Sequence, residues 1–357
     1  MTDAPGAFEI AGHRIGEPGT VFVIAELSAN HLGEVDRALA LVEAAADAGA
    51  DAVKLQTYTP DTMTLDVDGR DFRLDSGPWA GRTLYDLYGE ACTPWEWHPR
   101  LRDAATEAGL VFLSTPFDET AVDFLDELGV PAFKIASFEL VDVPLLRAVG
   151  RTGKPALLST GLATMDEVAE AIEALRDAGC RGTALLHCTS AYPAALEDAN
   201  LLTIPALQER FGLPVGLSDH TLDPAVPAAA AGLGACILEK HFTLRRDDGG
   251  PDAGFSLEPD EFRHAASTAR AAARARGVVK DGPTPGEQES RIFRRSLIAV
   301  RDIPKGARIE PGWVRSLRPA IGLHPRFLDE VIGRRTSVNI QMGTGLRWDY
   351  LEPENGE

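Results

Sequence analysis

The feature that most constrains the fold is a series of eight short apolar runs between residues 21 and 238. Each run is nearly continuous in hydrophobicity, which is typical of a strand buried on both faces of a parallel sheet. The runs are Val21–Ala25, Ala52–Leu55, Leu110–Leu113, Ala132–Ile135, Pro155–Leu158, Thr183–Leu186, Leu213–Leu217 and Cys236–Leu238. Amphipathic patterns, most of them closed by Gly, predict intervening helices at Val35–Ala48, Pro94–Ala108, Glu119–Leu128, Asp166–Ala178 and Asp223–Leu233.

This alternation predicts an α/β fold in which eight parallel strands and their helices close into a (β/α)₈ barrel. An open, doubly wound sheet is the alternative, but no Gly-x-Gly-x-x-Gly motif follows the first run. The predicted parts are an N-terminal hairpin at 1–19, the barrel at 20–281, a Gly/Pro/Glu-rich linker at 282–291 and a small β-rich module at 292–357.

The composition excludes several classes of partner. A net charge of −19 argues against nucleic acid or an anionic membrane surface. No apolar run reaches the roughly eighteen residues of a membrane span, and residues 1–19 lack the apolar core of a signal peptide. The four Cys lie far apart, as expected for reduced thiols of a cytoplasmic protein. Three of the six Lys, at positions 54, 134 and 240, lie in or at the end of apolar runs, which predicts a buried pocket for an anion. Lys240 directly precedes His241 and would point to the opposite side of its strand, which predicts a structural ion-pair partner at that position.

Polar residues gather where the predicted strands end, and these ends build the active site of a barrel. Individually, such residues have structural explanations: a Ser after a strand is often a helix N-cap, a Glu often pairs with a nearby Lys, and a His is often a satisfied core residue. Their convergence from all eight strands favours a functional site. The set comprises Glu26, Lys54, Gln56, Thr115, Lys134, Ser137, Glu139, Ser159, Ser190, Tyr192, Ser218, His220 and His241.

The residue types indicate a chemistry. His220 and His241 would end neighbouring strands and suit a divalent metal that polarises a carbonyl group. Lys and hydroxyl side chains suit a phosphate and a carboxylate, and Glu26 and Glu139 are candidates for proton transfer. Together they predict an aldol-type carbon–carbon bond formation between a phosphorylated carboxylic acid and an aldehyde or ketone. A metal aldolase that uses pyruvate and a non-catalytic sugar-binding protein are the alternatives.

Several segments carry a resemblance to a known family. They are Ala25–His31, Lys54–Thr57, Ser114–Phe117, Leu158–Gly161, Gly216–Thr221, Glu239–Thr243 and Gly249–Asp252. In this order they resemble the sialic acid synthases, which are phosphoenolpyruvate-dependent nonulosonate synthases. The C-terminal module, with Arg318-Pro319 and Gly322–Pro325, is similar to the antifreeze-like (SAF) domain of that family.

The resemblance implies roles for individual residues. His220 and His241 would bind Mn²⁺, or Mg²⁺ or Co²⁺, and Glu26 and Glu139 would flank the reacting atoms. Arg318 would reach the active site of a second subunit in a domain-swapped homodimer. The residues around the sugar, a hexosamine-derived aldehyde, would be Gln56, Tyr192, Asp252, Phe293 and Arg318. Those around phosphoenolpyruvate would be Lys54, Thr115, Lys134, Ser137, Ser159, Ser190 and Ser218.

The segments Tyr58–Leu65, Thr83–Tyr88, Thr93–His98 and Cys188–Pro193 most resemble the pseudaminate-forming branch of the family. Its transferases condense phosphoenolpyruvate with 2,4-diacetamido-2,4,6-trideoxy-L-altropyranose and release phosphate. Ala320 and His187 depart from the pattern expected of this branch, and N-acetylneuraminate or legionaminate formation is the alternative within the family. Phe138 and the aromatic segment from Trp79 to Trp97 predict an apolar pocket wall, which suits a 6-deoxy sugar.

Overall fold

The computed structural model describes residues 6–75, 77 and 79–353. Residues 1–5 of the predicted hairpin, residues 76 and 78 of the predicted barrel and residues 354–357 of the predicted C-terminal module lie outside the described residues. The chain divides into two compact units, Met1–Gly277 and Val278–Glu357. Each has a hydrophobic core of its own. The boundaries predicted at 281/282 and 291/292 remain predictions. Among the described helices, none is both long and apolar enough to cross a membrane.

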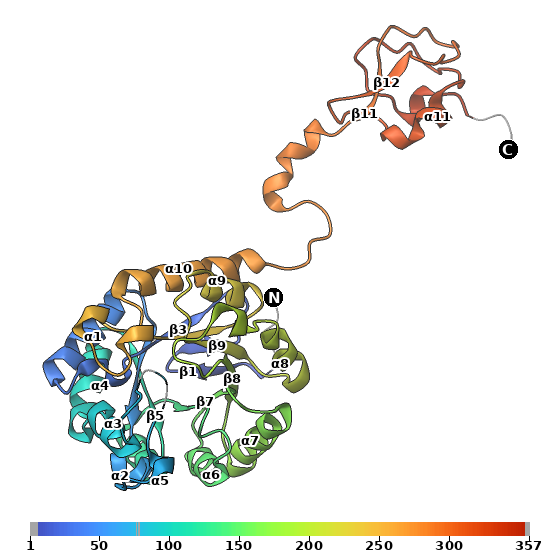
Figure 1. Ribbon diagram of the computed structural model, residues 1–357. Helices are drawn as coiled ribbons and strands as arrows, with labels where there is room; N and C mark the ends of the chain where they lie inside the picture. The colour runs from blue at the N-terminus through green and yellow to red at the C-terminus, as the bar shows by residue number, and fades with distance from the viewer. Residues whose placement is uncertain (1–5, 76, 78, 354–357) are drawn as a thin grey trace. The chain divides into compact units, whose positions relative to one another are not determined.

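The first unit is a closed barrel of eight parallel strands, which confirms the predicted (β/α)₈ fold (Figure 1). Several strands extend past the apolar runs because buried polar residues at the barrel mouth continue the ladder after the hydrophobicity has ended. The strands are β3 (Phe22–Glu26), β4 (Ala52–Thr57), β5 (Val111–Pro116), β6 (Phe133–Ile135), β7 (Ala156–Ser159), β8 (Thr183–Cys188), β9 (Val215–Asp219) and β10 (Ile237–His241). β10 pairs with both β9 and β3 and so closes the barrel.

Helices surround the barrel (Figure 1). Five occupy the predicted places with shifted ends: α1 (Val35–Asp47), α4 (His98–Glu107), α5 (Glu119–Leu128), α7 (Met165–Ala178) and α9 (Ala225–Gly232). Three further helices, α6 (Val143–Arg151), α8 (Thr203–Phe211) and α10 (Pro259–Arg276), were not predicted from the sequence. Each has Pro in its first turn, where Pro resembles a helix breaker in sequence but is tolerated because the N–H it lacks would have no partner.

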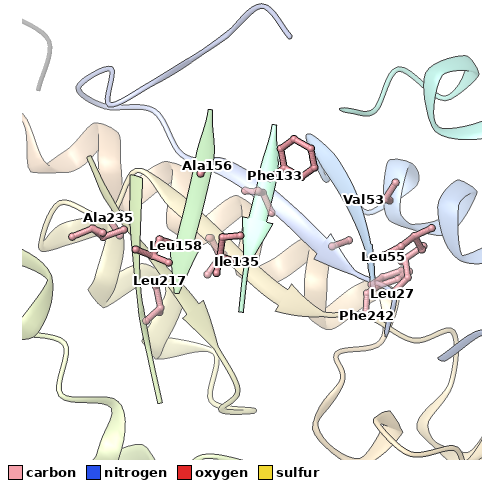
Figure 2. Packing of buried hydrophobic residues seen from close by; sticks show 14 of the residues in the cluster. Leu27, Val53, Leu55, Phe133, Ile135, Ala156, Leu158, Leu217, Ala235 and Phe242 are labelled. Atoms are coloured by element: carbon pink, nitrogen blue, oxygen red, sulfur yellow. The ribbon is translucent and has the colours of Figure 1, made fainter. Parts of the chain in front are cut away.

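Alternation along the strands creates two apolar layers. One lies between the barrel and its helices, and Figure 2 labels members of it, including Val53 on β4, Ile135 on β6 and Leu158 on β7. The other fills the amino-terminal end of the barrel interior. The hairpin of β1 (Phe8–Ile10) and β2 (His13–Ile15) contributes Ile10 and Ile15 to that inner layer. The opposite end of the interior is therefore left for polar side chains.

The long segment after β4 contains α2 (Pro60–Met63), α3 (Leu84–Ala91) and the 3₁₀ turns η2 (Arg70–Phe72) and η3 (Trp95–Trp97). The remaining 3₁₀ turns of the first unit are η1 (Ser28–His31), η4 (Leu196–Ala199), η5 (Arg246–Asp248) and η6 (Ala253–Phe255). Trp79 anchors the long segment to another loop, because its indole N–H donates to the carbonyl of Pro251 over 2.9 Å.

The second unit is small and contains the antiparallel pair β11 (Ser296–Ala299) and β12 (Val314–Leu317). Leu297, Ile303 and Leu346 are among the buried residues of its core. Its other elements are α11 (Leu328–Val331) and the turns η7 (Pro285–Glu287), η8 (Glu289–Phe293), η9 (Pro325–Phe327) and η10 (Trp348–Tyr350). The stretch predicted as a linker thus carries 3₁₀ turns.

Candidate active site

A polar cavity lies at the carboxyl ends of the barrel strands. Most of the residues predicted there do line it: Glu26, Lys54, Gln56, Thr115, Lys134, Ser137, Ser159, Tyr192, Ser218, His220 and His241. These side chains come from widely separated parts of the sequence, and the closed sheet brings them together because parallel strands end at one rim. Glu139 and Ser190 lie beside the cavity, whereas Phe293 and Arg318 belong to the second unit, so their assignment stays a prediction.

The centre of the cavity is a network of buried charges. Lys54 forms a close ion pair with Glu26, donates to the Thr115 hydroxyl over 3.1 Å and lies 3.7 Å from a carboxylate oxygen of Glu239. Lys134 lies 3.2 Å from the same oxygen of Glu239. Burial by itself lowers the pKa of Lys54, but Glu239 and Glu26 outweigh that effect and raise it. Lys54 is therefore a stable cation in a site that excludes most water.

Small polar groups surround this network. The backbone N–H of Gly161 donates to the Ser137 hydroxyl over 3.1 Å, and Ser159 is a buried hydroxyl without a hydrogen-bond partner. A Cβ atom on Gly161 would lie 2.6 Å from the Ser137 Oγ and 2.3 Å from the Ser190 Oγ, so these two hydroxyls converge on one point. Convergent hydroxyls beside two Lys form a site that suits an anion with several oxygens.

His220 and His241 form a second corner of the cavity. Their ring centroids lie 5.3 Å apart, and Tyr192 and Phe255 pack on them at 4.5 Å from His220 and 4.9 Å from His241. The Nδ1 atom of His220 is 2.9 Å from the carbonyl oxygen of Thr189, which fixes the orientation of the ring. Burial holds the pKa of His241 well below its usual value, and its Nδ1 has no hydrogen-bond partner. A neutral imidazole with an unpartnered nitrogen is the form that binds a metal ion.

Three carboxyl groups in or near the cavity, those of Glu139, Glu26 and Asp252, differ in their surroundings. Burial raises the pKa of Glu139 to about 7, and one of its oxygens has no partner. Glu26 also has a pKa raised by burial, but its ion pair with Lys54 opposes that shift. Asp252 accepts a close hydrogen bond from the Ser28 hydroxyl, and burial raises its pKa as well. A pKa of about 7 lets Glu139 exchange a proton near neutral pH.

Side-chain direction separates Lys240 from its neighbours. Glu239 and His241 face the cavity, whereas Lys240 between them points outward and pairs with Asp219 over 2.8 Å. Lys240 is therefore a structural ion-pair partner, as its place in the strand predicts. Glu239 was not assigned a role from the sequence, although its two-residue spacing from His241 was a signal for it. Phe117 and Cys188 also line the cavity and were missed.

The predicted aromatic wall is formed by fewer residues than expected. Phe138 is 57% exposed and lines the cavity. Trp79 packs on Tyr192 with ring centroids 5.8 Å apart. By contrast, Trp95 packs on Phe124 and Trp97 on His31, and neither lines the cavity.

The fold and the site define a (β/α)₈ barrel with two buried Lys and a pair of His at the carboxyl ends of its strands. The chain belongs to the NeuB family, whose model matches residues 41–281, and an SAF domain model matches residues 294–352. Both matches confirm the predicted sialic acid synthase family and its C-terminal domain.

Individual relatives agree with this assignment. The chain is 42% identical over 327 residues to the pseudaminic acid synthase of Campylobacter jejuni, covering 92% of this chain and 95% of that protein. It is 38% identical to the N,N′-diacetyllegionaminic acid synthase of Legionella pneumophila, over 94% of this chain and 96% of the other. A crystal structure of an N-acetylneuraminic acid synthetase from Leptospira borgpetersenii superposes with a TM-score of 0.73 at 30% identity, covering 81% of this chain and 96% of that one.

Proposed function

We propose that this protein is a pseudaminic acid synthase, which condenses phosphoenolpyruvate with 2,4-diacetamido-2,4,6-trideoxy-L-altropyranose to form pseudaminic acid and phosphate. The observation that carries the proposal is the shared cavity of Lys54, Lys134, His220 and His241. Similarity to a pseudaminic acid synthase over 92% of the chain supports this sugar, whereas legionaminate and neuraminate synthases are more distant relatives.

Phosphoenolpyruvate would occupy the positively charged part of the cavity. Lys54 and Lys134 would neutralise its phosphate and carboxylate, because both ammonium groups are buried and face the cavity. Hydroxyl groups would complete its contacts and fix the orientation of the enol carbon. These come from Thr115, Ser137, Ser159, Ser190 and Ser218.

A divalent ion, Mn²⁺ or else Mg²⁺ or Co²⁺, would be held by His220 and His241. The neutral, partly unpartnered imidazole of His241 fits such an ion. Among the described residues no group of three His, Cys, Asp or Glu forms a metal site, so substrate or water would supply the remaining ligands. When bound, the ion supplies Lewis-acid polarisation of the sugar aldehyde.

In the reaction, C3 of phosphoenolpyruvate forms a bond to the aldehyde carbon, whose oxygen takes up a proton. The C2–C3 electron pair makes this bond, so C2 becomes electron-deficient and water adds to it. Loss of both water protons, one to the new hydroxyl group and one to phosphate, forms the 2-keto group as the C2–O bond breaks and phosphate leaves with the electron pair of that bond. We assign the deprotonation of that water to Glu139, because its pKa of about 7 lets it accept a proton at neutral pH. Glu26 instead orients Lys54 and Gln56, whose amide donates to Glu26 over 3.2 Å.

The sugar would lie toward Gln56, Tyr192 and Asp252. Phe138 supplies an exposed apolar surface at the cavity, which suits the methyl group of a 6-deoxy sugar better than a hydroxymethyl group. Phe293 and Arg318 would complete the sugar site from the SAF domain of a second subunit in a domain-swapped homodimer.

An assay of phosphate release with Mn²⁺ and phosphoenolpyruvate tests the proposal. The altrose derivative should support release, and N-acetylmannosamine and the legionaminate precursor should support it at least about tenfold less well, as expected for pockets that differ by single groups. Clear preference for either competitor would replace the proposed sugar. Sugar binding without phosphate release would instead favour a non-catalytic relative.

A further inference from the structure

Glu239 is a buried carboxylate at the centre of the site, and the reaction above gives it no role. It lies on β10, two residues before His241, and its side chain faces the cavity. The residue is 3% exposed, so its charge is not screened by bulk water. Isolated buried carboxylates are strongly unfavourable, which means that specific partners must hold this one in place.

Those partners are three proposed ligands of phosphoenolpyruvate. One oxygen of Glu239 lies 3.2 Å from the Lys134 ammonium group and 3.7 Å from that of Lys54, and it accepts a hydrogen bond from Ser218 over 3.3 Å. The other oxygen has no hydrogen-bond partner. Glu239 therefore occupies the same donors that an incoming phosphate or carboxylate needs.

The charges near the centre balance without substrate. Lys54 and Lys134 carry two positive charges, and Glu26 and Glu239 carry two negative ones. Glu26 contacts Lys54, whereas Glu239 contacts both Lys and the Ser218 hydroxyl. A phosphate bound to these lysines would consequently lie close to a fixed carboxylate, and like charges at such a distance repel each other inside a protein.

We propose that Glu239 is a positioning residue that acts through Lys54 and Lys134: its negative charge limits their affinity for phosphate, so that the phosphate formed in the reaction is released. The inference rests on the proposed function and adds to it a determinant of product release.

Glu239→Gln tests the inference, because the amide keeps the shape and the oxygen acceptor while removing the charge. Isothermal titration of the full chain with inorganic phosphate should show binding tighter by on the order of tenfold, the effect of removing one nearby like charge. Product inhibition by phosphate should strengthen in parallel, KM for phosphoenolpyruvate should fall, and kcat should fall because release becomes slow. A merely structural role predicts the opposite sign, with weaker phosphate binding and a higher KM.

The matched control is Asp36→Asn, which also converts a carboxylate to an amide but at a side chain that is 87% exposed and paired with Arg100. Phosphate binding to that variant should equal that of the unchanged protein. If Glu239→Gln does not fold, Glu239→Ala removes the same charge and should also bind phosphate more tightly. Unchanged or weaker phosphate binding in the folded variant overturns the inference and leaves the proposed function intact. Failure of the unchanged protein to bind phosphoenolpyruvate removes both.

Discussion

At the scale of single residues, buried carboxyl groups with similar sequence surroundings have different properties in the site. Glu26 and Glu139 both follow barrel strands, and both are candidates for proton transfer on sequence grounds. Glu26 is paired with Lys54, whereas Glu139 has a pKa raised to about 7 by burial. Burial raises the pKa of both groups, but a direct ion pair with Lys54 opposes the rise at Glu26, and no local pattern contains that contact.

Glu139→Gln should lower kcat by about a hundredfold or more, the usual contribution of a general base. The same change should alter the pH dependence of stability. The folded pKa of about 7 exceeds the ordinary 4.5, so between these values the folded state binds one more proton than the unfolded state. The stability that Glu139 provides is complete below pH 4.5 and is lost as the pH rises through 7.

Because Gln does not ionise, the stability of the variant relative to the unchanged protein should rise by about 3 kcal/mol between pH 4.5 and pH 8. Urea unfolding at several pH values measures this gain, and phosphate release measures kcat. Parallel stability curves for the two proteins would show that Glu139 does not have the raised pKa.

At the scale of elements, the loop after β7 positions part of the anion site. Its Gly161 leaves room for two hydroxyls that approach from different loops, those of Ser137 and Ser190. This close approach requires the absence of a side chain. Gly in a βα loop therefore has a steric purpose here, while other Gly residues such as Gly129 and Gly179 adopt the left-handed conformation that ends a helix.

Gly161→Ala should raise KM for phosphoenolpyruvate by about thirtyfold, because the new methyl group displaces both hydroxyls and each hydrogen bond contributes about 1 kcal/mol. Stability should fall by about 1–2 kcal/mol, since the two hydroxyls can rotate away but the Ser137 Cβ, 3.1 Å from the new methyl group, has to shift. Steady-state kinetics and thermal unfolding check the two expectations. Gly232→Ala, whose Cβ would meet nothing within 4 Å, is the control and should leave KM unchanged. An unaltered KM in Gly161→Ala would remove Ser137 and Ser190 from the anion site.

At the scale of the whole molecule, the barrel unit and the SAF unit carry different parts of the predicted site. The barrel holds the anion-binding and His residues, and the SAF unit holds Phe293 and Arg318. In a homodimer with exchanged domains, each active site contains residues from the barrel of one chain and from the C-terminal domain of the other. The proposal that Arg318 acts in the active site of a second subunit can be tested with dimers that combine two differently substituted chains.

Co-expression of a His220→Ala chain with an Arg318→Ala chain should restore about a quarter of full activity, although each variant alone is inactive. Random pairing makes half of the dimers mixed, and each mixed dimer has one complete site if Arg318 acts in the partner. Phosphate release from the unfractionated co-expressed protein measures the recovery, and mixed dimers purified through two different tags should show about half of full activity. The control pairs His220→Ala with His241→Ala, both in the barrel, and should recover nothing. Inactive mixed dimers of the first pair would place Arg318 in the site of its own chain.

Much of the fold and part of the site follow from the sequence alone. Eight apolar runs separated by helical patterns specify a barrel because parallel strands buried on both faces need helical crossovers. Two-residue alternation then decides which side chains face inward, which places His241 in the cavity and Lys240 outside it. These features depend on local periodicity, which can be recognised in the amino-acid sequence without a structure.

Only the tertiary structure decided which inward-facing groups touch. Glu239 meets Lys54 and Lys134 because β10 closes the barrel against β3 and β9, and that register depends on packing around the entire ring. The raised pKa of Glu139 likewise depends on burial by neighbours distant in sequence. Periodicity determines the direction of a side chain, whereas distances and electric fields depend on the closed assembly of all eight strands.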